Sequence, residues 1–236
     1  MKKFITLALM LSIGLFVTAC SDGSADKNES KPEDATSEQQ KEELTFGSEE
    51  RVAEDTPVVS VNGTEINGDH YNSVYTRVKT MLYNYGQDVS NLDVIKEQTI
   101  TLLIDEELIR QDAAEKGIEV TEEEAQTELE AIKEETGEEQ YNNMLEQFQM
   151  SDEEFRDQLI NDLTTMQYME DQFDIEVTEE EIKEYYDKLK EQNEKIGELT
   201  EVEDRIESAL YSQKQSEQLQ VKVEELKKEA EVETLI

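Results

Sequence analysis

The chain has 236 residues, with 60 Asp and Glu against 22 Lys and Arg, so its formal net charge is −38. Sequence-independent binding to nucleic acid needs Lys and Arg to neutralise phosphates, and this composition excludes it. One Cys and one His exclude an internal disulfide, a thiol redox pair and metal sites built from Cys or clustered His. Hydrophobic residues make up 36% of the chain, so their spacing must decide which parts fold.

The first residues have the organisation of a secretory signal. Lys2 and Lys3 precede an almost unbroken apolar run over residues 4–17, which is too short for a comfortable membrane span. The run ends in Val17-Thr18-Ala19-Cys20, which resembles the lipobox of bacterial lipoproteins. We therefore expect a lipoprotein signal peptide over residues 1–19 and a diacylglycerol on Cys20 that anchors the chain to a membrane. The alternative is a plain secretory signal with a buried Cys.

Residues 20–56 are mostly polar, with more acidic than basic residues, and Leu44 and Phe46 are isolated apolar residues among them. A segment of this composition cannot bury enough apolar surface to offset the entropy lost on ordering. The sequence therefore predicts a disordered acidic tether over residues 20–56, followed by a folded domain over residues 57–236.

The folded domain is expected to open with a short β-hairpin. Val58-Val59-Ser60-Val61 is rich in β-branched residues, Asn62-Gly63 is a strong two-residue turn signal, and Thr64-Glu65-Ile66 can return as the second strand.

Helical periodicity follows the hairpin. The first helix is predicted from apolar residues spaced three and four apart, and Gly86 ends it: Tyr71, Val74, Tyr75, Val78, Met81, Leu82 and Tyr85. A second helix is predicted over about residues 92–116, with Gly117 as the residue that follows its end.

Three capping boxes mark the starts of later helices. Each places a hydroxyl three residues before a carboxylate: Thr121 with Glu124, Ser151 with Glu154, and Thr178 with Glu181. A short helix is predicted around Tyr141 to Phe148, and a last long helix is predicted to start after Thr200. Residues 232–236 are a candidate strand.

The order and spacing of these segments resemble the N-terminal domain of the SurA and PrsA chaperone-foldases. The resemblance spans about residues 58–187 and resumes in the final helix. It is carried by four features: the Val58 to Gly63 hairpin, Leu103 to Ile109 with Gly117-Ile118, the three capping-box starts, and Tyr185-Tyr186. It implies a mostly helical module in which residues 200–236 form a closing helix that packs back on residues 58–187.

The sequence departs from these foldases after Tyr185-Tyr186-Asp187. The family pattern inserts a parvulin prolyl-isomerase domain there, whereas only residues 188–199 separate that point from the last helix. Twelve residues cannot form a domain, whose usual minimum is about 50 residues. His70 stands alone, whereas parvulin sites use more than one His, and we interpret it as a surface or capping residue. No isomerase activity is expected.

No other enzyme signature is present. The sequence has no Gly-rich phosphate loop, nucleophile elbow or pair of metal-binding His residues, so we expect no catalytic residue, cofactor or metal. The Glu runs at 122–124 and 179–181 could attract divalent cations loosely, but their place at predicted helix starts favours a solvated capping role.

The resemblance implies a chaperone that holds unfolded or partly folded secreted or envelope proteins on the extracytoplasmic face of the cell membrane. Large adaptable side chains are the candidate client-binding residues: Tyr71, Tyr75, Met81, Tyr85, Met166 and Met169. Two other functions remain open, namely a dedicated scaffold or assembly partner for one envelope protein, and a domain that serves only as a spacer.

Overall fold

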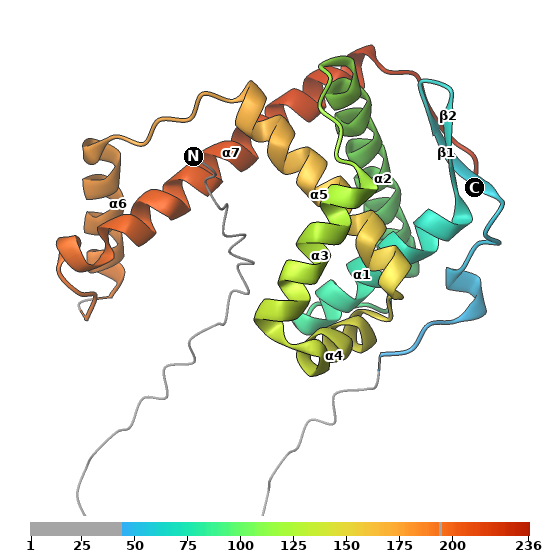
Figure 1. Cartoon of the computed structure of the whole chain (residues 1–236), viewed down its shortest axis with the longest axis horizontal. Helices are drawn as coiled ribbons and strands as arrows, with labels where there is room; N and C mark the ends of the chain where they lie inside the picture. The colour runs from blue at the N-terminus through green and yellow to red at the C-terminus, as the bar shows by residue number, and fades with distance from the viewer. Residues whose placement is uncertain (1–43, 194) are drawn as a thin grey trace, which may run out of the picture. The chain divides into compact units, whose positions relative to one another are not determined.

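Helices make up most of the computed structural model, which describes residues 44–193 and 195–236 (Figure 1). The elements in chain order are the 3-10 turn η1 (Ser48–Glu50), β1 (Pro57–Val61), β2 (Thr64–Asn67), α1 (Gly68–Asn84), α2 (Leu92–Glu115), α3 (Glu122–Thr136), α4 (Glu138–Phe148), α5 (Asp152–Gln172), α6 (Glu179–Gln192), α7 (Leu199–Glu229) and β3 (Val232–Thr234). The predicted mostly helical class is confirmed. None of the helices in these ranges is long and apolar enough to cross a membrane. The predicted signal peptide and Cys20 lie outside the described residues.

The predicted hairpin is present as β1 and β2. Asn62 and Gly63 have φ angles of 53° and 83°, and positive values at both central residues are what a type I′ turn requires. β3 pairs antiparallel with the other side of β1, which confirms the predicted C-terminal strand and gives the sheet order β2-β1-β3. Val58, Val59 and Val61 of the central strand are fully buried, so the sheet forms one wall of the core.

All three predicted capping boxes are present. In each, the hydroxyl accepts a hydrogen bond from the backbone N–H three residues on, and the Glu carboxylate accepts one from the N–H of the capping residue. The start of α7 differs from the prediction, because the helix begins at Leu199 and its N-cap Glu198 makes no side-chain capping bond. Leu199 is half-buried against α6, and this packing extends the helix to include Thr200 in its first turn.

Two hydrophobic cores lie in the first part of the domain. The main core joins the sheet to α1 and α2, and it includes Val74, Val78, Ile95 and Leu103 beside the valines of β1. A second core joins α3, α4 and α5 around Leu129, Tyr141 and Leu159. The side chains in these cores come from the helical stripes that the spacing of apolar residues predicts.

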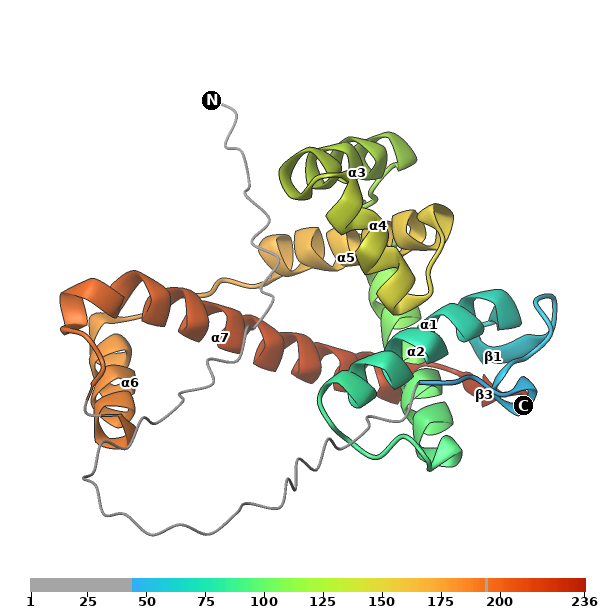
Figure 2. The same ribbon diagram turned by 90° about the horizontal axis from the view of Figure 1, so that it is seen from below.

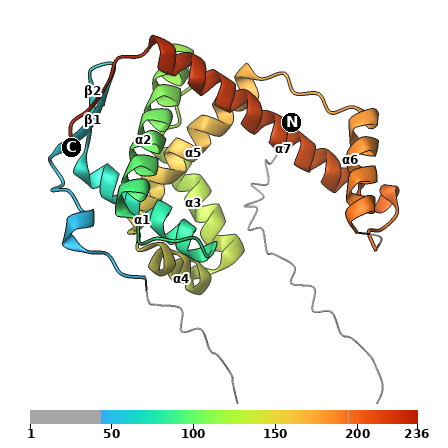
Figure 3. The same cartoon turned by 180° about the vertical axis from the view of Figure 1, so that it is seen from behind.

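The last helix packs in two separate places. Its first half lies beside α6 (Figure 2). There Val202 and Ile206 are buried against Ile182 and Tyr186. Its second half lies beside α2 (Figure 3). There Val223 joins a cluster from α2 and α5. The predicted return of the last helix onto earlier helices is therefore confirmed for the full row of apolar residues: Val202, Ile206, Leu210, Val223 and Leu226.

A polar network fixes α2, α5 and α7 to one another around Asp112. The carboxylate of Asp112 accepts hydrogen bonds from the Tyr168 hydroxyl and from Lys116 Nζ at 2.9 Å, and Lys222 Nζ of α7 lies 3.6 Å away. Burial alone would raise the pKa of Asp112, but these three partners outweigh it and hold the pKa below its usual value. The ionised carboxylate is thus compensated by the Tyr168 hydroxyl of α5, by Lys116 directly after α2 and by Lys222 of α7.

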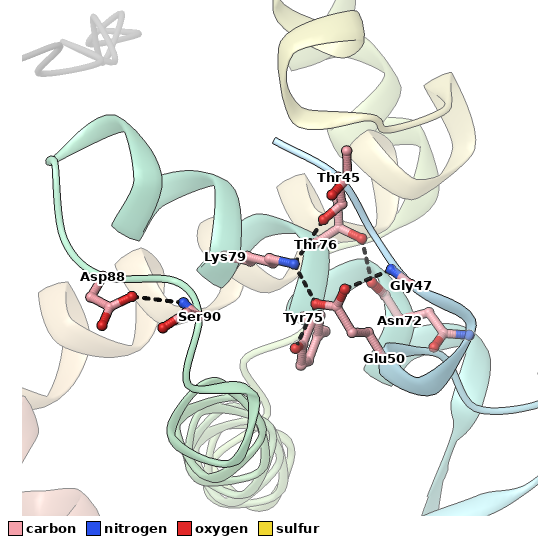
Figure 4. A network of polar contacts seen from close by, with 9 residues as sticks. All are labelled: Thr45, Gly47, Glu50, Asn72, Tyr75, Thr76, Lys79, Asp88 and Ser90. Atoms are coloured by element: carbon pink, nitrogen blue, oxygen red, sulfur yellow. Dashed lines mark hydrogen bonds and ion pairs between the residues drawn. The ribbon is translucent and has the colours of Figure 1, made fainter. Parts of the chain in front are cut away.

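The folded domain begins earlier than the predicted residue 57. Residues 44–52, which we call the N-terminal strap, lie against α1 (Figure 4). Glu50 is buried and accepts hydrogen bonds from Lys79 Nζ at 2.5 Å and from the Tyr75 hydroxyl at 2.9 Å. Phe46 is half-buried against the main core, with Lys79 Nζ 4.9 Å from its ring centroid.

Backbone groups of the strap are held by side chains of α1 as well. Asn72 Oδ1 accepts a hydrogen bond from the N–H of Val52 at 2.9 Å, and Asn72 Nδ2 donates to the carbonyl of Val52 at 2.8 Å. Lys79 Nζ also donates to the carbonyl of Thr45. Composition alone predicted disorder here, because the few apolar residues are isolated in sequence. The interactions that order the strap come from α1, which is distant in sequence.

Candidate functional site

Two of the predicted client-binding residues belong to the core. Tyr71 and Tyr75 are each only 2% exposed, and their ring centroids lie 5.7 Å apart inside the main core. The Tyr75 hydroxyl is engaged by Glu50 of the strap. Burial and the neighbouring carboxylate raise the pKa of Tyr71 to about 12, so this phenol stays neutral at physiological pH. Neither side chain reaches an open surface.

The other four candidates are more accessible. Met81 is 46% exposed and Tyr85 is 71% exposed, and both lie at the C-terminal end of α1. Met166 is half-buried against the core of α3, α4 and α5, and Met169 on the same helix is also half-buried. Of the six predicted residues, Met81 and Tyr85 are thus the pair that offers a neighbouring apolar surface to a partner.

A cavity of about 440 Å³ lies beside β2 and was not predicted from the sequence. Its walls come from β2, the first turn of α1, the middle of α2 and the first half of α5. Ile66, Leu103 and Ile160 give it an apolar side. The remaining lining includes five acidic residues, Glu65, Asp69, Glu106, Glu107 and Asp157, and also Arg110 and His70.

Two of these carboxylates are neutralised within the protein. Arg77 Nη2 donates to Glu106 Oε1 at 2.7 Å, and His70 Nε2 lies 3.5 Å from Glu106 Oε2. Burial alone would raise the pKa of Glu106, but the His70 and Arg77 contacts outweigh it and lower the pKa. Arg110 donates to the Glu107 carboxylate from Nε at 2.8 Å and from Nη2 at 2.6 Å. His70, predicted as a surface or capping residue, is partly exposed in the first turn of α1, with its imidazole directed at Glu106.

The other three carboxylates of the cavity are exposed at its rim. Glu65, Asp69 and Asp157 have no cation within 4.0 Å among residues 44–193 and 195–236. The same ranges contain no group of three His, Cys, Asp or Glu side chains that could hold a metal ion. The cavity therefore combines an apolar wall with a rim of uncompensated negative charge.

The residues that line this cavity come from segments that are distant in sequence. Glu65 and Ile66 were predicted as part of a hairpin, and residues 103–109 were notable only for the family resemblance. Asp157 and Ile160 lie on α5, whose contact with α2 depends on tertiary packing. The only possible signal was the acidic pair Glu106-Glu107 on a face of α2 that also carries Leu103.

Comparisons with known proteins define the class. A family profile described as the SurA-like N-terminal domain matches residues 43–169, which include the strap, the hairpin, α1 to α4 and most of α5. The match covers more than half of the chain, and the chain belongs to this family.

One curated relative is the foldase protein PrsA of Caldanaerobacter subterraneus subsp. tengcongensis. It is 31% identical to this chain over 145 residues, which amount to 57% of this chain and 43% of that protein. The chain therefore matches less than half the length of this relative. The family and the relative together support a chaperone or foldase class.

Proposed function

We propose that this chain is an extracytoplasmic chaperone that binds unfolded or partly folded secreted or envelope proteins and does not isomerise prolyl bonds. Membership of the SurA-like N-terminal family carries the chaperone class. A short link supports the absence of isomerase activity, because only residues 193–198 join α6 to α7 at the point where the foldases insert a parvulin domain.

The proposal includes an anchor and a tether. Cys20 carries the lipid after removal of residues 1–19, and the chain from Cys20 to residue 43 connects it to a domain that starts at the strap. The lipobox-like residues Val17-Thr18-Ala19-Cys20 support the anchor. Two acyl chains on one residue suffice for stable membrane attachment.

The membrane anchor can be tested with Cys20→Ala in the native host. We expect the variant to leave the membrane fraction and to appear in the medium or to accumulate unprocessed, because no thiol remains to receive the lipid. Fractionation followed by mass measurement reads the result. A variant of normal mature size that stays in the membrane fraction would show that another feature anchors the chain.

Client binding can be tested with the processed chain carrying Cys20→Ser, so that no lipid is attached. Equimolar protein should suppress aggregation of several reduced or thermally unfolded secreted proteins. The effect should persist as the screening length falls from about 10 Å at 0.1 M salt to about 3 Å at 1 M, because apolar capture does not depend on charge. The same preparation should leave the isomerisation rate of a prolyl peptide unchanged.

A matched pair of double variants locates the apolar surface. Met81→Ser with Tyr85→Ser should reduce the protection, whereas Tyr211→Ser with Val221→Ser removes comparable exposed apolar surface from α7 and should not. Circular dichroism confirms that both variants keep their helices. Protection of only one native partner, with none for unrelated clients at either salt concentration, would favour the dedicated-scaffold function.

A further inference from the structure

The outer edge of β2 has no neighbouring strand within the described ranges, because the sheet order is β2-β1-β3. Val61 and Thr64 flank the two-residue turn and form a hydrogen-bonded pair, so the next pair, Ser60 and Glu65, exchanges no hydrogen bonds. The peptide N–H and C=O of Glu65 therefore point away from β1. An extended chain can pair with such groups as an additional strand.

The cavity beside this edge suits one long cationic side chain. Ile66, Leu103 and Ile160 supply an apolar surface, and a volume of about 440 Å³ accommodates a group of that size. Lys and Arg bind well where a methylene stem lies on apolar atoms and the charged head reaches carboxylates. The rim supplies those carboxylates from Asp69 and Asp157.

Charge complementarity selects the occupant. Residues 21–43 of this chain contain eight acidic residues against three Lys, and a second copy of the chain carries a net charge of −38. Glu106 and Glu107 are already paired with cations of the domain, whereas Glu65, Asp69 and Asp157 are not. The negative charge of the cavity is therefore complemented neither by residues 21–43 nor by a second copy of the chain. A foreign segment with a positive side chain does complement it.

We propose that the outer edge of β2 pairs with an extended client segment and that the adjoining cavity receives a Lys or Arg side chain from that segment. The inference rests on the proposed chaperone function and names the client chemistry that this site selects. It gives clients two points of recognition, since main-chain bonds to Glu65 accept any sequence and the cavity prefers a cation.

The preference of the cavity for a cationic side chain is tested with two fluorescein-labelled peptides of ten residues. Both alternate Thr and Val, and the central residue is Lys in one and norleucine in the other. The processed Cys20→Ser chain should bind the Lys probe more tightly by fluorescence anisotropy. Asp69→Asn with Asp157→Asn should weaken the Lys probe by about three- to tenfold and leave the norleucine probe unchanged. Glu184→Gln with Asp187→Asn removes two exposed charges from α6 and should change neither affinity.

Pairing of the client with the outer edge of β2 is tested with Glu65→Pro, which removes the outward N–H of residue 65 and leaves the pairing of β2 with β1 intact. Both probes should weaken. Thr234→Pro is the matched control on the opposite edge of the sheet. Glu231 and Leu235, on either side of β3, bond to Asn62 and Val58, so the alternation along the strand directs the peptide groups of Thr234 away from β1. This control should leave binding unchanged. If Glu65→Pro lowers the helical content, the double variant Asp69→Asn with Asp157→Asn still tests the inference. The test is then whether that variant lowers the affinity for the Lys probe relative to the affinity for the norleucine probe.

The outcomes separate this inference from the proposed function. Equal affinity of the wild-type chain for both probes overturns the inference even when the chain still suppresses aggregation of clients. Competition by a peptide of residues 21–43 assigns the site to the chain's own tether and also overturns it. A chain that binds the Lys probe selectively but protects no client would retain the site and refute the chaperone function.

Discussion

Deleting residues 200–236 is expected to abolish the cooperative unfolding transition of the domain. The deletion removes β3 from the sheet and removes Leu219, Val223 and Leu226 from the clusters that they share with α2 and α5. Burial of one such side chain contributes about 1.5–3 kcal/mol, so their combined loss approaches the usual total stability of about 5–15 kcal/mol. Thermal unfolding followed by circular dichroism and calorimetry measures the transition.

A matched pair of substitutions separates packing from mere shortening of the chain. Val223→Ala should lower the free energy of unfolding by about 2 kcal/mol, because Val223 is buried between helices. Val221→Ala, two residues earlier and 59% exposed, should change it by less than about 0.5 kcal/mol. A truncated chain that melts at the wild-type temperature with the same cooperativity would show that α7 is independent of the earlier helices.

Local chemistry made most of the helices predictable. The capping boxes at Thr121, Ser151 and Thr178 each act within four residues, so the sequence alone located three helix starts. The turn at Asn62-Gly63 is equally local. The start of α7 was misplaced by contrast, because the contact between Leu199 and α6 that sets it is tertiary.

Long-range contacts explain what the sequence could not predict. The apolar stripe of α1 predicted a buried face, but periodicity cannot tell that Tyr71 and Tyr75 lie in the core while Tyr85 at the helix end lies in solvent. The strap depends on Glu50 meeting Lys79, which is 29 residues away. The cavity depends on α5 bringing Asp157 to the side of α2 and β2.

The strap sets where the domain can be connected to a membrane anchor. Its last residue, Val52, is held on both backbone groups by Asn72, and Glu50 is held by Lys79 and Tyr75. A pull transmitted along the chain from the proposed lipid on Cys20 would therefore reach α1 first, and not the hairpin. Both side chains of the Glu50–Lys79 ion pair are almost fully buried, so removal of one partner would leave the other charge buried without compensation.

Lys79→Met is expected to destabilise the docked strap by about 3–5 kcal/mol at pH 7, because it leaves the Glu50 carboxylate buried without a cation. The strap can leave α1 and expose Glu50 to water, which limits the loss of stability of the whole domain. We therefore expect the amides of residues 44–52 to lose protection from hydrogen exchange before the domain unfolds. Hydrogen exchange of the strap amides measures the local effect. Urea unfolding measures the global one.

The response to pH should have opposite signs in the wild type and the variant. In the wild type, burial alone would raise the pKa of Glu50, but Lys79, the N–H of Gly47 and the Tyr75 hydroxyl outweigh it and hold the pKa below 4.5. A lowered folded-state pKa contributes stability that is fully present above the unfolded value of about 4.5. That stability is lost as the pH falls through the folded-state pKa, so acid should release the wild-type strap.

In Lys79→Met the cation is gone and burial becomes the dominant influence, so the pKa of Glu50 should rise above its usual value. A raised carboxyl pKa means that protonation favours the docked state, and acidification should therefore restore protection of the variant strap. Glu50→Gln with Lys79→Met carries no charge at either position and should recover much of the stability with no dependence on pH in this range. A strap that is equally protected in the wild type and in Lys79→Met at pH 7, with the same response to acid, would contradict the assignment of this ion pair as the attachment of the strap.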